Sequence, residues 1–238
     1  MCDVCGCGDP HKMTIDVHAS LLSDNDREAL HLREHFVADG VLALNVMGSP
    51  GSGKTALIEA VAHALSGRLR LAAVSGDLAT SLDAERLSKA GVAAATITTG
   101  SACHLDASMV HHALHGDFAS SVAGCDVFFI ENVGNLVCPA IYDLGQAANV
   151  VVLSITEGVD KPLKYPVMFR KADLVVLSKI DLLPHLPGVS LTAIRENLAR
   201  VMPSAAAIDV SATSGAGIEE LVAWMEKRRP RVDHQTPR

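Results

Sequence analysis

One stretch of eight residues has the composition and position needed to hold phosphate groups. It reads GSPGSGKT and follows an apolar run, residues 41–47, that is typical of a buried strand. In such a loop the backbone N–H groups point at phosphates, the lysine reaches the β and γ oxygens, and the threonine hydroxyl coordinates Mg²⁺. A ligand-free turn between strand and helix is the alternative, but the sequence favours a P-loop that binds a nucleoside triphosphate. The residues expected to bind it are Gly48, Ser49, Gly51, Ser52, Gly53, Lys54 and Thr55.

Acidic residues after two further apolar runs are candidates for the magnesium chemistry of such a loop. Glu131 closes the run before it, and Gly134 follows where a backbone N–H can contact a γ-phosphate. With Thr55, both Asp77 and Glu131 are expected to serve Mg²⁺, and Lys54, Asp77 and Glu131 form the catalytic set. Asp77 and the nearby Asp83 can equally be loop and helix-capping acids. No obvious arginine finger appears near the P-loop, so we expect slow turnover.

Two later loops indicate which base is bound. Ser178-Lys179-Ile-Asp181 follows an apolar strand, and a carboxylate there accepts two hydrogen bonds from the N1–H and amine of guanine, a donor pair that adenine lacks. Lys179 is expected to lay its aliphatic stem along the base. GTPase loops of this kind usually read NKxD, so Ser178 loses a bracing amide. Ser211-Ala212 after the last strand resembles the loop that completes guanine recognition, and together these motifs favour GTP over ATP.

Three cysteines near the N-terminus form the first set of candidate metal ligands. Cys2, Cys5 and Cys7 supply soft donors within six residues, beside the amine of Met1 if the chain begins there. Thiolates with an amine suit Ni²⁺ as well as Zn²⁺. Chance cysteines on a mobile tail are the alternative.

A second set of ligands lies within the nucleotide-binding part. Cys103 and His104 follow the third predicted strand, and Cys138 comes seven residues after Glu131. Adjacent ligands on one loop cannot close a four-coordinate site, so Cys138, water or a second chain must complete it, with Ni²⁺ or Zn²⁺ as the ion. A segment that tightens around the γ-phosphate would therefore also move a metal ligand. Two buried cysteines beside a histidine at a helix start are the alternative.

The remaining histidines and Cys125 are weaker candidates. His111, His112 and His115 share one predicted helix, and His111 and His115 lie one turn apart on one face. We expect an exposed polar face there. Cys125 begins an apolar strand and is expected to be a buried thiol.

Composition limits the class of protein. The 238 residues are 49% hydrophobic but only 3% aromatic, which predicts an aliphatic core of the kind that buried parallel strands require. The formal charge of −7 argues against a nucleic-acid partner. The absence of a long apolar run argues against a membrane span, and six cysteines without a signal peptide favour metal ligands or thiols in the cytoplasm.

Strand-like and helical segments alternate along most of the chain. This alternation predicts an α/β P-loop NTPase fold, with a mainly parallel sheet and helices on both faces. We expect a flexible metal-binding tail over residues 1–22, a nucleotide-binding domain over 23–230 that opens with an amphipathic helix at 23–38, and a disordered end at 231–238. The expected strands are 41–47, 69–75, 93–98, 126–130, 150–155, 174–178 and 206–210, and the longer helices are 54–65, 83–90, 106–115, 191–201 and 217–229.

With these motifs in hand, the chain resembles the HypB family, GTPases that help load nickel into NiFe hydrogenases. The resemblance runs from about residue 25 to 229. Its most specific elements are CHLD at Cys103–Asp106 with Met109 and Val110, ENVGNLVCP at Glu131–Pro139 and GVDKPLKYP at Gly158–Pro166. The N-terminal CxxCGC is similar to the high-affinity nickel site of some members. The histidine tracts of some relatives are absent.

The resemblance implies a functional cycle. It implies that Cys103, His104 and Cys138 bind metal at the two-fold interface of a GTP-dependent homodimer, that Lys161 contacts nucleotide across it, and that hydrolysis releases nickel. A HypA-type nickel/zinc accessory protein and the NiFe hydrogenase large subunit are the implied partners. A urease-type nickel chaperone GTPase, a P-loop kinase and a passive metal store are the alternatives.

Overall fold

The computed structural model describes residues 10–77, 80–100, 102–202 and 206–230, with side chains from Leu22 onward. The cysteine motif of residues 2–7 and the terminal residues 231–238 lie outside this part, so the predictions made for them stay predictions. No helix in the described ranges is both long and apolar enough to cross a membrane.

The sheet confirms the predicted α/β fold. In the part of the chain that the structure describes, seven strands, all parallel, lie in the order β3-β2-β4-β1-β5-β6-β7, with β1 at the centre. Every strand begins or ends within two residues of its predicted bounds, because each is an aliphatic run between turn residues. The strands are β1 (Leu42–Gly48), β2 (Leu71–Asp77), β3 (Ala93–Thr98), β4 (Val127–Glu131), β5 (Ala148–Ser154), β6 (Leu174–Ser178) and β7 (Ala206–Val210).

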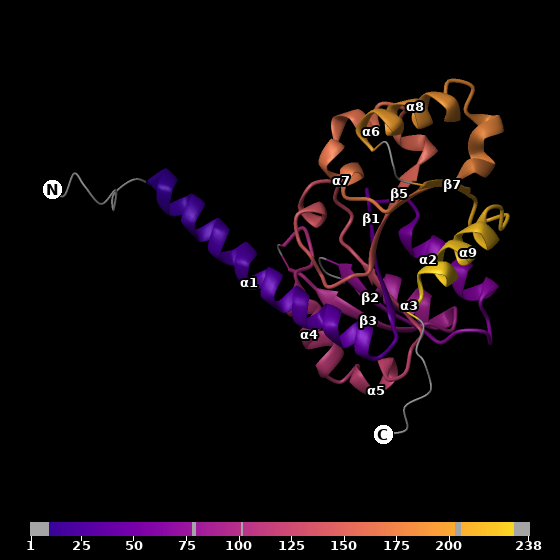
Figure 1. Ribbon diagram of the computed structural model, residues 1–238. Helices are drawn as coiled ribbons and strands as arrows, with labels where there is room; N and C mark the ends of the chain where they lie inside the picture. The colour runs from indigo at the N-terminus through magenta and orange to yellow at the C-terminus, as the bar shows by residue number, and fades with distance from the viewer. Residues whose placement is uncertain (1–9, 78–79, 101, 203–205, 231–238) are drawn as a thin grey trace.

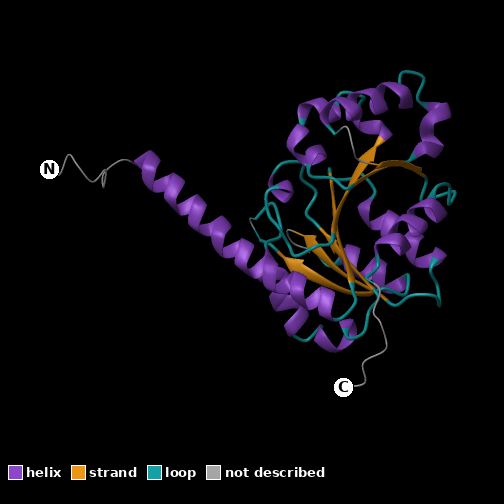
Figure 2. Cartoon of the chain, in the orientation of Figure 1, coloured by secondary structure: helices purple, strands orange, loops and turns teal. Residues whose placement is uncertain are grey.

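Helices cover both faces of the sheet (Figures 1 and 2). On one face α2, α3 and α9 pack on alternate residues of the strands, and on the other α1 and α4 cover the β2–β4 half while α7 and α8 cover the β5–β6 half. The helices are α1 (Pro10–Ala38), α2 (Lys54–Ala64), α3 (Leu82–Lys89), α4 (Ala107–His115), α5 (Ala119–Val122), α6 (Lys161–Lys164), α7 (Pro166–Arg170), α8 (Leu191–Val201) and α9 (Ile218–Arg228), with short 3₁₀ turns η1 (Cys138–Ala140), η2 (Ile155–Glu157) and η3 (Ile180–His185).

The first helix is longer than the sequence pattern indicated. It begins at Pro10 rather than near Ser23, and its N-terminal half projects away from the body of the domain (Figure 1). Proline suits the first turn of a helix, and the residues that follow contain neither glycine nor proline, so nothing stops the helix from extending. The helix expected over 23–38 therefore begins 13 residues earlier than predicted.

The C-terminal half of α1 is fixed to the domain by apolar and polar contacts. Ala29, Leu32 and Phe36 are buried against the sheet. The amide of Asn25 donates to the carbonyl of Asp143 (2.9 Å) and accepts from the N–H of Ala107 (2.9 Å), so this helix is tied to the start of α4.

Candidate nucleotide and metal sites

The phosphate-binding loop connects the central strand to α2 and takes the conformation that its glycines allow. Gly51 and Gly53 have φ of 72° and 100°, a region that side chains rarely adopt. The Lys54 ammonium curls back over the loop, 3.5 Å from the carbonyl oxygen of Gly48 and 3.3 Å from that of Ser49. Burial lowers the pKa of Lys54, although Glu131 opposes the shift. A lysine ammonium held beside the backbone of this loop is suited to bind phosphate oxygens.

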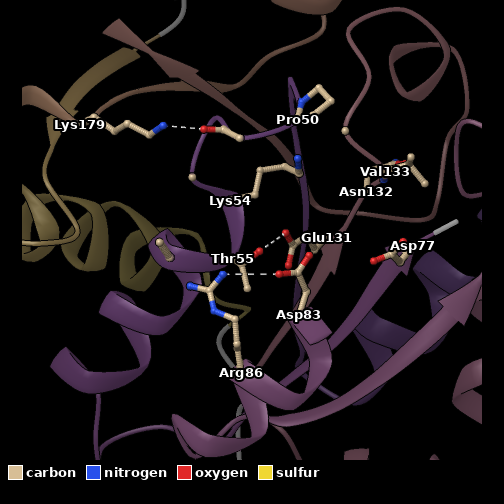
Figure 3. Close-up of a pocket in the computed structure, with 15 residues that line it drawn as sticks. Pro50, Lys54, Thr55, Asp77, Asp83, Arg86, Glu131, Asn132, Val133 and Lys179 are labelled. Carbon is tan, nitrogen blue, oxygen red and sulfur yellow. Dashed lines mark hydrogen bonds and ion pairs between the residues drawn. The ribbon is translucent and has the colours of Figure 1, made fainter. Parts of the chain in front are cut away.

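Glu131 lies beside this loop at the carboxyl end of β4, as predicted. The Thr55 hydroxyl donates to Glu131 Oε1 over 2.7 Å, while Oε2 is buried with no hydrogen-bond partner (Figure 3). Only 3% of the residue is exposed, and this burial raises its pKa to about 7. A hydroxyl and a carboxylate with an unused buried oxygen are the hard ligands that Mg²⁺ prefers, so these residues fit that ion.

A pocket of about 510 Å³ opens over the loop and receives several of the predicted residues. Its lining includes Asp77, the last residue of β2, and Asp83 of α3 (Figure 3). The Asp77 carboxylate accepts a hydrogen bond from Thr80 (2.6 Å), and Asp83 lies in the first turn of α3. The pocket thus brings both acids to the phosphate site, and the helix-start position foreseen for Asp83 is also observed.

Arg86 is a pocket residue that sequence reasoning missed. It lines the same pocket, although it stands far from the P-loop in the chain. Its guanidinium donates to Glu59 at 3.1 and 2.6 Å and lies 3.6 Å from Asp83. The acidic partners hold this cation at the wall of the pocket. In the sequence, the only signal for Arg86 was its three-residue spacing from Asp83, which places the two side chains next to each other on a helix.

The segment after Glu131 lies against the P-loop. A methyl group added to Gly134 would come within 2.8 Å of the Pro50 nitrogen, so only glycine fits. Asn135 forms an isolated antiparallel bridge with Gly48. Gly134 therefore lies against the backbone of the P-loop, and its contact with a γ-phosphate stays a prediction.

Of the two loops predicted to bind guanine, the one after β6 contacts the P-loop. Because β6 and β7 are neighbours, the loops after them lie side by side, with Lys179 lining the pocket over the P-loop and Ser211 fully buried. The Lys179 ammonium donates to the Gly51 carbonyl over 2.6 Å (Figure 3). Asp181 is exposed in the first turn of η3, and Ala212 is half-buried.

Ser178 corrects one expectation drawn from the sequence. We expected the loop to lose its brace because serine replaces asparagine. Its hydroxyl instead donates to the Ser52 carbonyl over 2.6 Å, inside the protein. A shorter side chain thus still connects this loop to the P-loop.

Lys161 is linked to the P-loop indirectly, through the carboxylate of Glu157. Its ammonium lies 3.6 Å from Glu157, whose carboxylate accepts a hydrogen bond from the hydroxyl of Ser49. Lys161 is not among the residues that line the pocket. Its role across a subunit interface stays a prediction.

The three internal metal-ligand candidates come together, as the sequence predicted. The ligand atoms of Cys103, His104 and Cys138 lie within 4.8 Å of one another, and within the described residues no other group of three His, Cys, Asp or Glu side chains does so. The two thiols are 3.0 Å apart, and a hydrogen bond from Cys103 raises the pKa of the Cys138 thiol. The His104 ring stacks on Tyr142 at 3.9 Å, and burial lowers its pKa. Three N and S donors on one side of an ion leave a position open, which fits Ni²⁺ or Zn²⁺.

Two asparagines connect this cluster to the phosphate site. The side chain of Asn132, next to Glu131, accepts a hydrogen bond from the N–H of Leu105 (3.1 Å). Its amide nitrogen donates a hydrogen bond to the side-chain oxygen of Asn45 on β1 (3.2 Å). Asn135 donates to the carbonyl of Cys103 (3.4 Å). Sequence reasoning missed both residues, because an asparagine in a loop has no partner until the strands are placed side by side.

Fold and site together define the class of protein. A parallel sheet with a glycine-rich loop after its central strand, a buried lysine and a Thr–Glu pair is the arrangement of P-loop nucleotide-binding proteins. A family model described as the CobW/HypB/UreG nucleotide-binding domain matches residues 42–209. Hydrogenase maturation factor HypB of Rhizobium leguminosarum bv. viciae is 50% identical over 212 residues, which are 89% of this chain and 70% of that protein.

Solved structures agree with the family model. HypB from Helicobacter pylori in complex with nickel superposes with a TM-score of 0.79 at 39% identity, covering 90% of this chain and all of that one (100%). HypB from Archaeoglobus fulgidus gives the same TM-score of 0.79 at 37% identity, with 87% and 98% covered. The chain belongs to the HypB family of hydrogenase maturation factors.

Proposed function

We propose that this chain is a GTP-hydrolysing nickel metallochaperone, which uses nucleotide-dependent dimerisation to change metal binding at Cys103, His104 and Cys138. The single observation that carries the proposal is that one segment, residues 131–138, contributes to both the phosphate site and the metal cluster. It pairs with Thr55 through Glu131 at one end, and its last residue, Cys138, is a metal-ligand candidate. A nucleotide that repositions this segment must also move a metal ligand.

The chemistry of the pocket supports hydrolysis of a triphosphate. The ammonium of Lys54 and the backbone N–H groups of the loop neutralise the phosphates, and Mg²⁺, when bound by Thr55 and Glu131, adds charge neutralisation at the β and γ oxygens. Asp77, which lines the same pocket, is proposed to orient the attacking water. Asp181 and the loop at Ser211 are proposed to select guanine.

The coupling must be reciprocal. If GTP changes the nickel affinity of the cluster, nickel changes the GTP affinity by the same factor. Three protein ligands on one chain leave a fourth position, and a second chain can supply it, which is the reason to propose a homodimer at this face. Free thiols at the site require a reducing compartment, so we assign the protein to the cytoplasm.

The proposed recipients follow from the family. Maturation of a NiFe hydrogenase requires transfer of nickel to its large subunit, and we propose a HypA-type accessory protein as the partner in that transfer. The terminal cysteines Cys2, Cys5 and Cys7 are proposed to hold a further nickel ion.

The test compares nickel affinity in two nucleotide states. A chain with Cys2, Cys5 and Cys7 replaced by serine is titrated with Ni²⁺ in the presence of GDP and of a non-hydrolysable GTP analogue. We expect affinities that differ about fivefold or more, the lower bound typical of allosteric coupling. A control with Cys138→Ser should lose the difference. Equal affinities in the two states would refute the coupling, and phosphate release that is no faster with GTP than with ATP would refute the assignment of GTP.

A further inference from the structure

Four histidines face one another where α1 crosses α4. Each helix carries a pair spaced four residues apart, His31 and His35 on α1 and His111 and His115 on α4. The ring centres of His31 and His111 are 5.5 Å apart, those of His35 and His115 are 5.4 Å apart, and those of His111 and His115 are 4.2 Å apart. The exposed face predicted for this helix was wrong for His111, which is half-buried beside α1.

These separations match shared coordination of one ion. With a metal–nitrogen distance of about 2 Å, two imidazoles bound to a tetrahedral ion have ring centres about 5 Å apart. Both interhelical pairs come close to this value. Histidines four residues apart on one helix face are also a recurrent metal-ligand spacing.

An acidic side chain completes the set. Glu28 lies one turn before His31 on α1, and its Oε1 is 2.8 Å from Nδ1 of His111. That oxygen is buried and makes no hydrogen bond of acceptable geometry. Nitrogen and oxygen ligands at neighbouring positions around one ion are separated by about 3 Å, given metal–ligand distances near 2.1 Å.

The tautomer of His115 leaves a nitrogen free for coordination. Its Nδ1 is 3.0 Å from the backbone carbonyl of His111, and a carbonyl can only accept, so Nδ1 carries the proton. Nε2 is then a lone-pair donor, and a hydrogen bond of this kind is the usual support for a metal-binding histidine.

We propose that Glu28, His31, His35, His111 and His115 form an additional metal site, separate from both cysteine-containing sets, which takes a borderline divalent cation such as Ni²⁺ or Zn²⁺. Nitrogen-rich donor sets of this kind select late first-row ions over Mg²⁺ or Ca²⁺. The donor atoms are not yet gathered as closely as those of Cys103, His104 and Cys138. His31, His35 and His115 are exposed, so rotation of their side chains brings the rings together.

The new site adjoins the cysteine cluster. A pocket of about 490 Å³ is lined by Glu28, a proposed ligand of the new site, and also by His104 and Tyr142 of the cysteine cluster. Glu28 and His104 therefore border the same cavity, whereas the four histidines lie outside its lining. The site itself does not depend on the nucleotide cycle proposed above, but a role in passing nickel to the cluster rests on that proposal.

The experiment removes every competing thiolate site. In the full chain, Cys2, Cys5, Cys7, Cys103 and Cys138 are replaced by serine, and the protein is titrated with Ni²⁺ and, separately, with Zn²⁺ by calorimetry. We expect one ion per chain, and we expect that ion to be lost when H111Q and H115Q are added. A matched control, H63Q with H185Q, removes two exposed histidines from other elements and should retain the ion.

A second pair of substitutions and a thermal unfolding measurement distinguish loss of the metal ligands from loss of folding. If H111Q and H115Q disturb folding, as judged by circular dichroism, the pair H31Q and H35Q on the opposite helix should also remove the ion. In this five-serine chain, which keeps only the buried Cys125, the metal should raise the unfolding temperature, because it crosslinks α1 to α4, and H111Q with H115Q should abolish that rise. Absence of binding in the five-serine chain, or equal binding in all the histidine variants, would overturn the proposal. Since the five-serine chain lacks the cysteine cluster, neither result depends on the nucleotide mechanism.

Discussion

The carboxyl group of Glu131 should make the stability of the nucleotide-free protein depend on pH. The group is buried beside the P-loop, and burial raises its pKa from 4.5 to about 7. Between these values the folded chain keeps a proton that the unfolded chain has released. The free energy of unfolding therefore falls as the pH rises through this window, and the loss is complete above about pH 7.

The substitution Glu131→Gln removes this dependence. The difference between 4.5 and about 7 corresponds to about 3 kcal/mol, at about 1.4 kcal/mol for each pH unit. Glutamine is neutral at every pH, and its amide oxygen can still accept the hydrogen bond of Thr55. The variant should therefore be more stable than the parent by about 3 kcal/mol near pH 8 and similar to it near pH 4.5. It should nevertheless bind Mg²⁺ and nucleotide more weakly, because it lacks the anionic oxygen.

Urea denaturation of the nucleotide-free protein, followed by circular dichroism at intervals between about pH 5 and pH 8, measures the effect. Glu219→Gln is the control, because Glu219 is exposed on α9 and its replacement should leave the pH dependence of the parent intact. Parallel curves for the parent and Glu131→Gln would show that the burial of this carboxyl has no such consequence, and the reasoning would fail.

Three other substitutions test the site. Gly134→Ala should lower nucleotide affinity at least tenfold in a titration with a fluorescent GTP analogue, because its new methyl group meets P-loop backbone at 2.8 Å, whereas Gly188→Ala, with nothing within 4 Å, should be neutral. Asn132→Ala should reduce the free energy of unfolding by about 1–3 kcal/mol, since it leaves the buried N–H of Leu105 unpaired, and an unchanged value in urea would contradict this account. Asp181→Asn should weaken GTP binding by about tenfold or more while ATP binding stays the same, and equal losses for both nucleotides would exclude base recognition by this residue.

The strands and the longer helices were readable from the sequence because local signals agreed with the global fold. Aliphatic runs bounded by glycine and polar residues became parallel strands, and Asp106 capped α4 through the N–H of Met109 (2.8 Å). The order of the strands in the sheet was not readable, since it depends on contacts between distant segments. The short helices α5, α6 and α7 were missed because four or five residues carry too little periodicity.

The site residues also fall into two groups, those that the sequence revealed and those that only the structure revealed. The P-loop and the three metal-ligand candidates were identified from residue types and spacing, because their chemistry restricts which side chains can serve. Arg86 and the linking asparagines were not identified, since nothing in a lone arginine or asparagine shows which group it will face. The histidines of α4 were predicted to lie on an exposed face, because the side chains that they contact are on α1, far away in the sequence.

The sequence by itself determined the chemistry available to this protein: a phosphate-binding loop, acids for Mg²⁺, a loop suited to guanine, and thiol and imidazole ligands for a late transition metal. Tertiary structure alone decided which of these groups are neighbours. Parallel strands bring the carboxyl ends of β1 and β4 to one edge of the sheet, and the loop after β4 then contacts both the phosphate site and the Cys103 loop. The physical reason is that bonding preferences belong to single residues, whereas distances between remote residues are fixed only when the strands pair and the helices bury their apolar faces.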